Sequence, residues 1–222
     1  MPARTAVLLG ATGLVGRHVL ARLAHDARWG RVVTLGRRPL PTASGTHEDH
    51  VVDFDRLAEQ AALFACDDLV CALGTTMKQA GSEAAFQRVD LEIPFEAAQL
   101  AHRQGATQML LVSALGADAG SRIFYNRTKG EAEDAVRSVG FEAVQILRPS
   151  LLTGDRAEPR LGERAAEVAL SLASPLLLGP LRALRPTPAE AVATALVETA
   201  AARPTGVHVY DPEAIRQAAA DP

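Results

Sequence analysis

Three side chains in the middle of the chain could together perform acid–base chemistry on a carbonyl group. Tyr125 and Lys129 lie four residues apart in the segment FYNRTKGEAE, and Ser113 follows an apolar run 12 residues before the tyrosine. On a helix, residues four apart share a face. An ammonium beside a phenol stabilises the phenolate, so Tyr125 could give or take a proton with the help of Lys129. Alternatively, the two are ordinary surface side chains.

A glycine-rich turn near the start of the chain carries a second kind of chemistry. Gly10, Gly13 and Gly16 follow the apolar run TAVLLG and open a stretch with helical spacing. Glycine here allows a tight turn, a close approach of pyrophosphate to the backbone, and close packing of helix and strand. The helix N-terminus offers unpaired N–H groups to phosphates. The alternative is a glycine turn without a ligand. We expect dinucleotide contacts from Gly10, Thr12, Gly13, Leu14, Val15 and Gly16.

Two arginines after the second apolar run bear on which dinucleotide binds. A site for NAD usually has Asp or Glu about 20 residues after the glycines. This chain has Arg37 and Arg38 there, and guanidinium groups suit the 2′-phosphate of NADP. We predict NADP(H), against the alternative of two solvated arginines. Further along, Asp53 could accept from the adenine amino group or could cap the next helix.

Apolar runs alternate with amphipathic stretches, and this alternation defines the expected fold. The runs are rich in Val, Leu and Ile and show little in/out alternation, as is typical of parallel strands covered on both faces. The pattern predicts an α/β fold, namely a doubly wound, mostly parallel Rossmann sheet with helices on both faces. We expect strands at 5–10, 31–36, 50–54, 68–74, 107–113, 142–149 and 206–210, and helices at 14–27, 55–63, 83–104, 126–139 and 188–202.

The composition changes after Pro149, where Pro and Gly recur. We interpret residues 150–187 as a small C-terminal cap on the substrate side, containing one helix near 163–173. No linker separates this segment, so residues 1–222 are expected to form one domain. A polar tail is expected to follow the last strand.

The overall composition excludes several classes of function. The net charge is −3 and aromatic residues make up 4% of the 222 residues, which argues against a nucleic-acid partner. Cys66 and Cys71 match no zinc motif and are expected to be buried thiols in a reducing compartment. The segment HEDH (47–50) is expected in a solvated loop, so no metal is predicted. With no secretory signal and no apolar run of about 18 residues, we expect no membrane association and a cytoplasmic location.

The motifs together resemble the short-chain dehydrogenase/reductases. GATGLVG, LGRRP, CALGTT, the strand ending in Ser113, YNRTK and LRPSLLTG occur in that family's order, and in detail they are similar to the atypical, extended-type branch of the Tat-interacting-protein oxidoreductases. The resemblance implies an extended-type Rossmann fold, NADP(H), and a catalytic set of Ser113, Tyr125 and Lys129. The further cofactor contacts expected are Arg37, Arg38, Asp53, Leu73, Gly74, Thr75, Tyr125, Lys129, Pro149 and Leu151.

The chain departs from the family pattern at two places. Ala114 stands where relatives often have a second serine, and the fourth helix lacks the asparagine that many members use, although Asp90 lies nearby.

The favoured function is an NADP(H)-dependent oxidoreductase acting on a small-molecule carbonyl or alcohol, as a monomer or homodimer. The alternatives are a dinucleotide sensor acting through a protein partner, and a sugar-nucleotide epimerase or dehydratase. The complete Ser–Tyr–Lys set favours the enzyme over the sensor, and the short segment after Pro149 leaves little room for a sugar-nucleotide domain.

Overall fold

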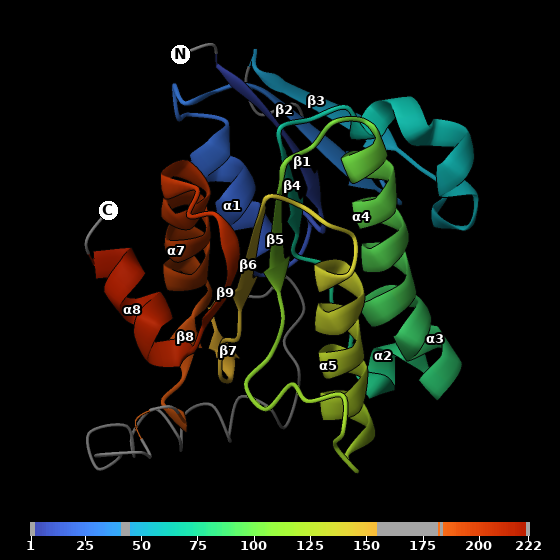
Figure 1. The fold of residues 1–222 in the computed structure, drawn as a ribbon, viewed down its shortest axis with the longest axis vertical. Helices are drawn as coiled ribbons and strands as arrows, with labels where there is room; N and C mark the ends of the chain where they lie inside the picture. Colours follow the sequence, from blue (N-terminus) through green and yellow to red (C-terminus); the bar gives the residue numbers. More distant parts are fainter. Residues whose placement is uncertain (1–2, 41–44, 155–181, 183, 221–222) are drawn as a thin grey trace.

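A parallel seven-stranded sheet forms the centre of the molecule in this computed structural model, which describes residues 3–40, 45–154, 182 and 184–220. The strand order is β3-β2-β1-β4-β5-β6-β9, and each neighbouring pair is parallel. All strands therefore end at one edge, at the bottom of Figure 1. The strands are β1 Arg4–Leu9, β2 Trp29–Gly36, β3 His47–Val51, β4 Asp68–Cys71, β5 Gln108–Val112, β6 Ala143–Leu147 and β9 Gly206–Tyr210.

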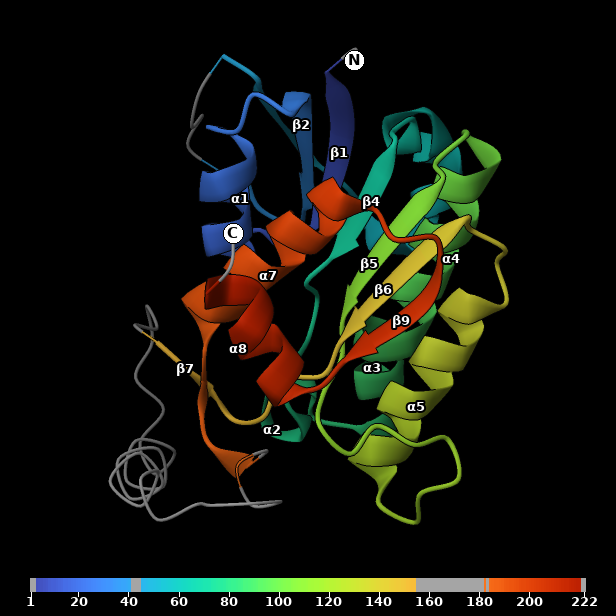
Figure 2. The same ribbon diagram turned by 60° about the vertical axis from the view of Figure 1, so that its left-hand side comes forward.

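Helices cover both faces of this sheet, as Figures 1 and 2 show. One face carries α1 (Gly16–Leu23), α7 (Ala189–Ala202) and α8 (Pro212–Ala220). The other carries η1 (Phe54–Phe64), α4 (Ile93–Arg103) and α5 (Phe124–Arg137). The doubly wound, mostly parallel α/β fold predicted from the sequence is confirmed.

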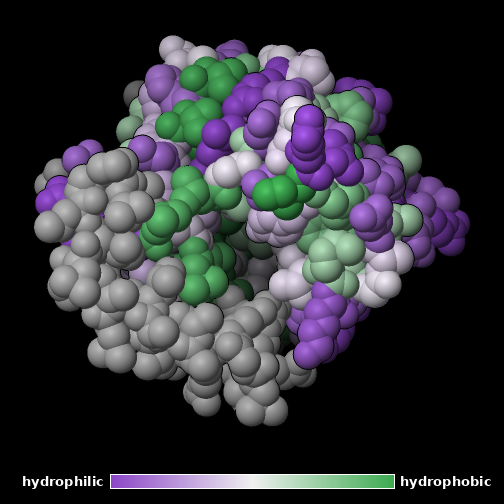
Figure 3. Space-filling model, turned by 90° about the horizontal axis from the view of Figure 1, so that it is seen from below, coloured by the Kyte–Doolittle hydropathy of each residue, from purple (hydrophilic) through white to green (hydrophobic). Residues whose placement is uncertain are grey.

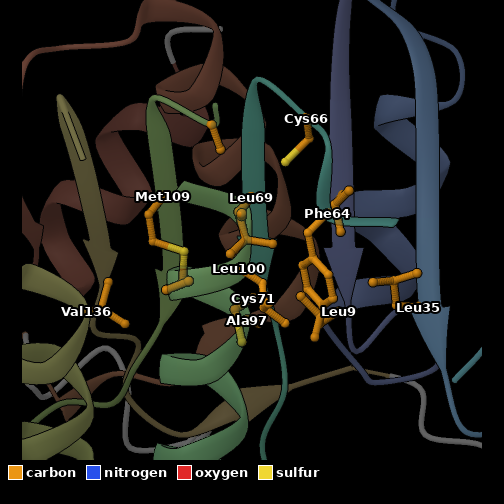
Figure 4. Packing of buried hydrophobic residues seen from close by; sticks show 14 of the residues in the cluster. Leu9, Leu35, Phe64, Cys66, Leu69, Cys71, Ala97, Leu100, Met109 and Val136 are labelled. Carbon is orange, nitrogen blue, oxygen red and sulfur yellow. The ribbon is translucent and has the colours of Figure 1, made fainter. Parts of the chain in front are cut away.

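Burial on both faces explains why the strands are almost continuously apolar. Successive side chains of a strand point to opposite faces. In β1, Val7 and Leu9 join the core beneath α4, whereas Ala6 and Leu8 join the core beneath α1 and α7. Figure 4 shows the first of these cores, in which Leu9 packs near Phe64 and Cys71 lies at its centre. The two cysteines are free, buried thiols, as expected.

The third strand lies earlier in the chain than predicted, so the prediction of a solvated HEDH loop is wrong. Residues 47–50 belong to β3 and pair with β2. Thr34 Oγ1 lies 2.8 Å from His47 Nε2 and donates to Asp49 Oδ1 at 2.6 Å. On the other face, Glu48 accepts two hydrogen bonds from Arg31. A strand this polar is stable because β2 supplies a partner for each of these side chains.

Several helices also differ from their predicted form. Residues 55–63 were expected to form an α-helix, but they lie in the 3-10 helix η1, which is interrupted at Arg56 and Gln60. The helix expected at 83–104 consists of α3 (Glu83–Gln87), a π-helical turn η2 (Arg88–Glu92) and α4. A short helix, α2 (Met77–Ala80), precedes them.

The prediction of a polar tail after β9 is wrong, because the chain forms α8 there. Asp211 Oδ1 accepts from the backbone N–H groups of Glu213 and Ala214, at 3.0 and 2.8 Å, and so caps the helix. Pro212 occupies the first helical position, where its missing N–H costs nothing. Ile215 anchors the helix by complete burial in the core.

Only the ends of the predicted cap are described. β7 (Leu152–Thr153) and β8 (Thr187–Pro188) pair in parallel and bring the two ends of this segment together. The helix expected near 163–173 lies outside the described residues.

Candidate functional site

The glycine loop between β1 and α1 forms a cradle that no larger residue could build. Gly10 has φ +86°, and a Cβ there would lie 2.6 Å from the carbonyl carbon of Ala72, at the end of β4. A Cβ on Gly16 would lie 2.0 Å from the Gly10 carbonyl oxygen. The Gly13 N–H donates to that same oxygen at 2.9 Å. The predicted reasons for glycine, a tight turn and close packing of helix and strand, are both met, and the arrangement fits a pyrophosphate at the start of α1.

A pocket beside this loop is lined by the two arginines that were predicted to select NADP(H) over NAD(H). Arg37 and Arg38 are exposed and line the pocket next to Gly10 and Thr12. Asp49 Oδ2 accepts from the Leu40 N–H at 2.7 Å and so holds the segment that follows the arginines. Six other lining residues were not predicted from the sequence, because small and apolar side chains give no signal of ligand contact. They are Thr34, Leu40, Phe54, Ala11, Leu35 and Gly36.

Asp53 stands at the start of η1, where its carboxylate accepts from the Asp55 N–H at 3.0 Å. Of the two alternatives drawn from the sequence, the capping role is therefore present in the structure. A contact with adenine stays a prediction.

The loop after β4 lies directly against the predicted catalytic lysine. The Thr75 N–H donates to Asp90 Oδ2 at 2.9 Å. Asp90 Oδ1 lies 2.6 Å from Lys129 Nζ, and both side chains are buried. A Cβ added to Gly74 would lie 3.7 Å from Asp90 Oδ1 and 4.0 Å from Lys129 Nζ. The structure thus brings together the predicted cofactor loop 73–76, Lys129 and Asp90.

Helix α5 positions Tyr125 and Lys129 on the same face. The Tyr125 side chain is 36% exposed, and its ring packs 5.6 Å from the ring of Phe86 on α3. Gly130 lets the loop 114–123 cross the helix closely, because a Cβ there would lie 2.1 Å from the Ala119 nitrogen. Tyr125 therefore reaches solvent at the carboxyl edge of the sheet, while Lys129 lies one turn deeper.

Ser113 lies at the predicted place, but its hydroxyl has a partner that the sequence did not reveal. Ser113 Oγ donates to Glu133 Oε1 at 2.6 Å in the buried interior. Glu133 also accepts from Arg148 and Arg137, and the hydrogen bonds between Arg148 and Glu133 raise the pKa of Arg148. A serine has one hydroxyl proton, so Ser113 offers an acceptor, not a donor, to the site. Glu133 is four residues after Lys129, and that helical spacing is the signal that could have revealed it.

The segment after β6 closes the site on its other side. The Leu115 N–H donates to the Pro149 carbonyl at 2.8 Å, which ties this segment to the loop after β5. Leu151 is 40% exposed, as is typical of the apolar residues on this edge, including Met77 and Ile123. Viewed from this end, Figure 3 shows apolar side chains around a hollow in the surface.

The fold and the glycine cradle define a dinucleotide-binding protein, and comparison with known proteins agrees. The chain belongs to an NAD(P)H-binding family, which it matches over residues 10–171. It is 35% identical to protein HTATIP2 of Rattus norvegicus, over 73% of this chain and 69% of that protein. It is 36% identical to mitochondrial protein fmp52 of Emericella nidulans, over 72% of this chain and 71% of that protein.

The solved structures show the same fold. MoeE5 in complex with UDP-glucose and NAD has a TM-score of 0.70 at 18% identity, covering 98% of this chain and 81% of that chain. The expected relation to NAD(P)-binding Rossmann proteins is confirmed, and so is the relation to HTATIP2.

The expectation of a purely cytoplasmic location is wrong, because the fungal relatives at 36% and 34% identity are named as mitochondrial proteins. Within the described ranges, no helix has both the length and the apolar character needed to span a membrane. In the same residues, no group of three or more His, Cys, Asp or Glu side chains could hold a metal ion.

Proposed function

We propose that this protein is an NADP(H)-dependent oxidoreductase of the short-chain dehydrogenase/reductase type, which reduces a small carbonyl compound or oxidises the corresponding alcohol. The observation that carries this proposal is the position of Tyr125 and Lys129. They share one face of α5 at the carboxyl edge of the sheet, and Lys129 lies beside loop 73–76. In doubly wound folds this edge is where ligands bind.

The side chains suggest a division of roles. A bound nicotinamide would supply or take up the hydride. Tyr125 would give its phenolic proton to the carbonyl oxygen during reduction and take it back during oxidation. Lys129 would stabilise the phenolate and donate to the ribose hydroxyls of the cofactor. Because the Ser113 proton is held by Glu133, Ser113 would have no proton to donate to the substrate carbonyl, and Tyr125 would be the donor to that oxygen.

The preference for NADP(H) rests on Arg37 and Arg38. Both are exposed beside the pocket at the end of β2. Forked, charge-assisted hydrogen bonds from guanidinium groups would stabilise a 2′-phosphate there. The apolar residues exposed at the mouth of the site suggest that substrates with apolar substituents react best.

The test is a panel of aldehydes, ketones and quinones with NADPH, followed by the loss of nicotinamide absorbance. The chain has two tyrosines, so Tyr210→Phe is a matched control for Tyr125→Phe. Tyr210 lies on β9, where its hydroxyl donates to Gln145. We expect Tyr125→Phe to lower turnover by roughly 10²–10⁴-fold and Tyr210→Phe to leave it near the native value.

Two results would contradict the proposal. Equal turnover in native protein and Tyr125→Phe would remove the acid–base role of the tyrosine. Tight NADPH binding without turnover of any member of the panel would favour a dinucleotide sensor instead.

A further inference from the structure

The best-defined buried charge pair next to the site joins two segments far apart in the sequence. Lys129 on α5 and Asp90 on η2 form an ion pair of 2.6 Å, with side-chain exposures of 7% and 0%. Removing two charges from water is costly, and a buried pair is therefore poor evidence of a contribution to stability. The pair lies beside loop 73–76, which is expected to contact the cofactor, and this position suggests a functional role.

Asp90 contacts both the lysine and the loop, one with each carboxylate oxygen. Oδ1 faces Lys129 Nζ, and Oδ2 accepts from the Thr75 N–H at 2.9 Å. The residue lies in a π-helical turn, a feature that is rare and frequently found at functional sites. One carboxylate thus fixes the backbone of loop 73–76 and the position of the ammonium together.

Gly74 marks the side from which a ligand could reach this pair. A Cβ at this position would lie within 4.0 Å of both Asp90 Oδ1 and Lys129 Nζ. The side-chain-free backbone of Gly74 leaves that space open, next to the loop expected to meet the cofactor ribose.

We propose that Asp90 is a positioning residue, which holds the Lys129 ammonium and loop 73–76 in one arrangement and provides the negative charge that keeps Lys129 protonated beside Tyr125. The inference rests on the proposed function, and it assigns to Asp90 a role that acts through Lys129 rather than by contact with substrate.

The charges around Lys129 agree with this role. Burial lowers the pKa of Lys129, but Asp90 on η2 raises it, followed by Tyr125 on α5 and Cys71 at the end of β4, and the net result is a raised pKa. Asp90 is the largest of the contributions that oppose burial. Without its charge, burial would favour the neutral amine.

The charge of Lys129 can be followed directly, because the chain has only two lysines, Lys78 and Lys129. In protein labelled with ¹⁵N and ¹³C at lysine, nuclear magnetic resonance gives one side-chain signal for each. Lys78 is exposed and serves as an internal reference. The variant is Asp90→Asn, and the matched control is Glu92→Gln, which removes a 55% exposed carboxylate two residues away on the same turn.

We expect Lys129 to lose its proton at the same, raised pH in the native protein and in Glu92→Gln. In Asp90→Asn it should lose its proton at a pH lower by about one unit or more, with Lys78 unchanged. Titration of Lys129 at the native pH in Asp90→Asn would overturn the inference. This measurement needs no substrate, so a failure of the proposed function, seen as no turnover by native protein, is a separate result.

The pH dependence of turnover gives a second measurement, which would not change if Asp90 had a purely structural role. In Asp90→Asn, kcat/KM should fall on the alkaline side, over the pH range in which Lys129 loses its proton. A uniform loss at every pH would contradict a role through Lys129.

If Asp90→Asn does not fold, the double variant Asp90→Asn/Lys129→Met decides. Folding of the double variant would support the inference, because removing the second charge repairs the defect of the first. Failure of both variants to fold would show that Asp90 serves the fold alone and would overturn it.

Discussion

Helix α5 buries two charges of opposite sign one turn apart, and they are partnered in different ways. The carboxylate of Glu133 accepts one hydrogen bond from Ser113, two from Arg148 and one from Arg137. These fill the roughly four acceptor positions of a carboxylate. The ammonium of Lys129 has three protons and faces Asp90 beside Gly74, at the edge where the cofactor is expected.

Under the proposed function, this difference distinguishes the structural charge of Glu133 from the charge of Lys129, which would take part in chemistry. A saturated carboxylate can take no further partner, so Glu133 fixes the strand ends that carry Ser113 and Arg148. The Lys129 ammonium has two N–H donors besides the one that faces Asp90, and these could donate hydrogen bonds to a ligand. Glu133 and Lys129 could not be distinguished by burial and ion pairing alone, because both are buried and both are paired.

A large effect on stability should come from Glu133→Gln. The amide cannot replace the charge opposite Arg148, and breaking a buried pair on one side costs about 3 kcal/mol of unfolding free energy, the low end of the usual range because both arginines are partly exposed. Urea unfolding measures this loss. Asp134→Asn, the exposed neighbour that also pairs with Arg137, should cost less than about 0.5 kcal/mol. Equal costs for the two variants would refute the special status of Glu133.

Lys129→Met should lower turnover as well as stability, because it also leaves the Asp90 carboxylate buried without its partner. Loss of the ammonium removes the stabilisation of the Tyr125 phenolate, and we expect kcat/KM to fall about 100-fold. Steady-state rates with NADPH measure the effect. Lys78→Met is the natural control, since it removes the other lysine of the chain. If both lysine variants keep native rates, Lys129 is no more available for chemistry than Glu133.

Arg37 extends the comparison to a charge at the surface. Arg37→Asp should reduce the ratio of NADPH to NADH affinity by at least about tenfold, because a charge-assisted hydrogen bond to the 2′-phosphate is replaced by repulsion. Quenching of protein fluorescence or calorimetry gives both dissociation constants. Arg56→Asp changes an exposed arginine that pairs with Glu59 on η1 and should leave the ratio unchanged. An unaltered ratio in Arg37→Asp would remove the assignment.

Cys66 and Cys71 differ from the buried charges of α5, because burial keeps their thiols neutral at ordinary pH. Burial raises the pKa of Cys66 to about 12 and that of Cys71 to about 11, from 9.0. Because both pKa values are raised in the folded state, this contribution to stability is complete well below pH 9. It declines as the unfolded thiols ionise around pH 9, until the folded thiols ionise at about pH 11 and 12. Between about pH 7 and pH 9 this decline should be about 1 kcal/mol or less. Urea unfolding of Cys66→Ala/Cys71→Ala should show a flatter pH dependence, and an unchanged slope would refute the assignment to the thiols.

The sequence predicted those parts of the fold in which local pattern and burial agree. The strand expected at 206–210 is β9 itself, and the helix expected at 188–202 differs from α7 by one residue. The tight glycine turn was predicted because strand, turn and helix follow one another along the chain. β3 was misjudged because its polar residues are satisfied by Thr34 and Arg31 on another strand.

The candidate site was predicted as a set of residues, but not as a set of contacts. Lys129 and Tyr125 are neighbours by helical spacing alone. The partners Asp90 of Lys129 and Glu133 of Ser113 lie 39 and 20 residues away in the chain. Helical spacing places Glu133 on the face of Lys129, but its contact with Ser113 and the contact of Asp90 with Lys129 join separate elements and have no periodic signature.

The pairing of β9 with β6 has a consequence for synthesis of the protein. β6 is apolar and wholly buried in the finished sheet, and its outer edge is covered only when residues 206–210 align with it. On the ribosome, nearly 60 residues must emerge after β6 before that edge can close. Until then the nascent chain presents an open apolar strand, the kind of edge that pairs with other chains. Shielding of that edge, by slow translation or by a chaperone, would therefore matter most during synthesis of the last quarter of the protein.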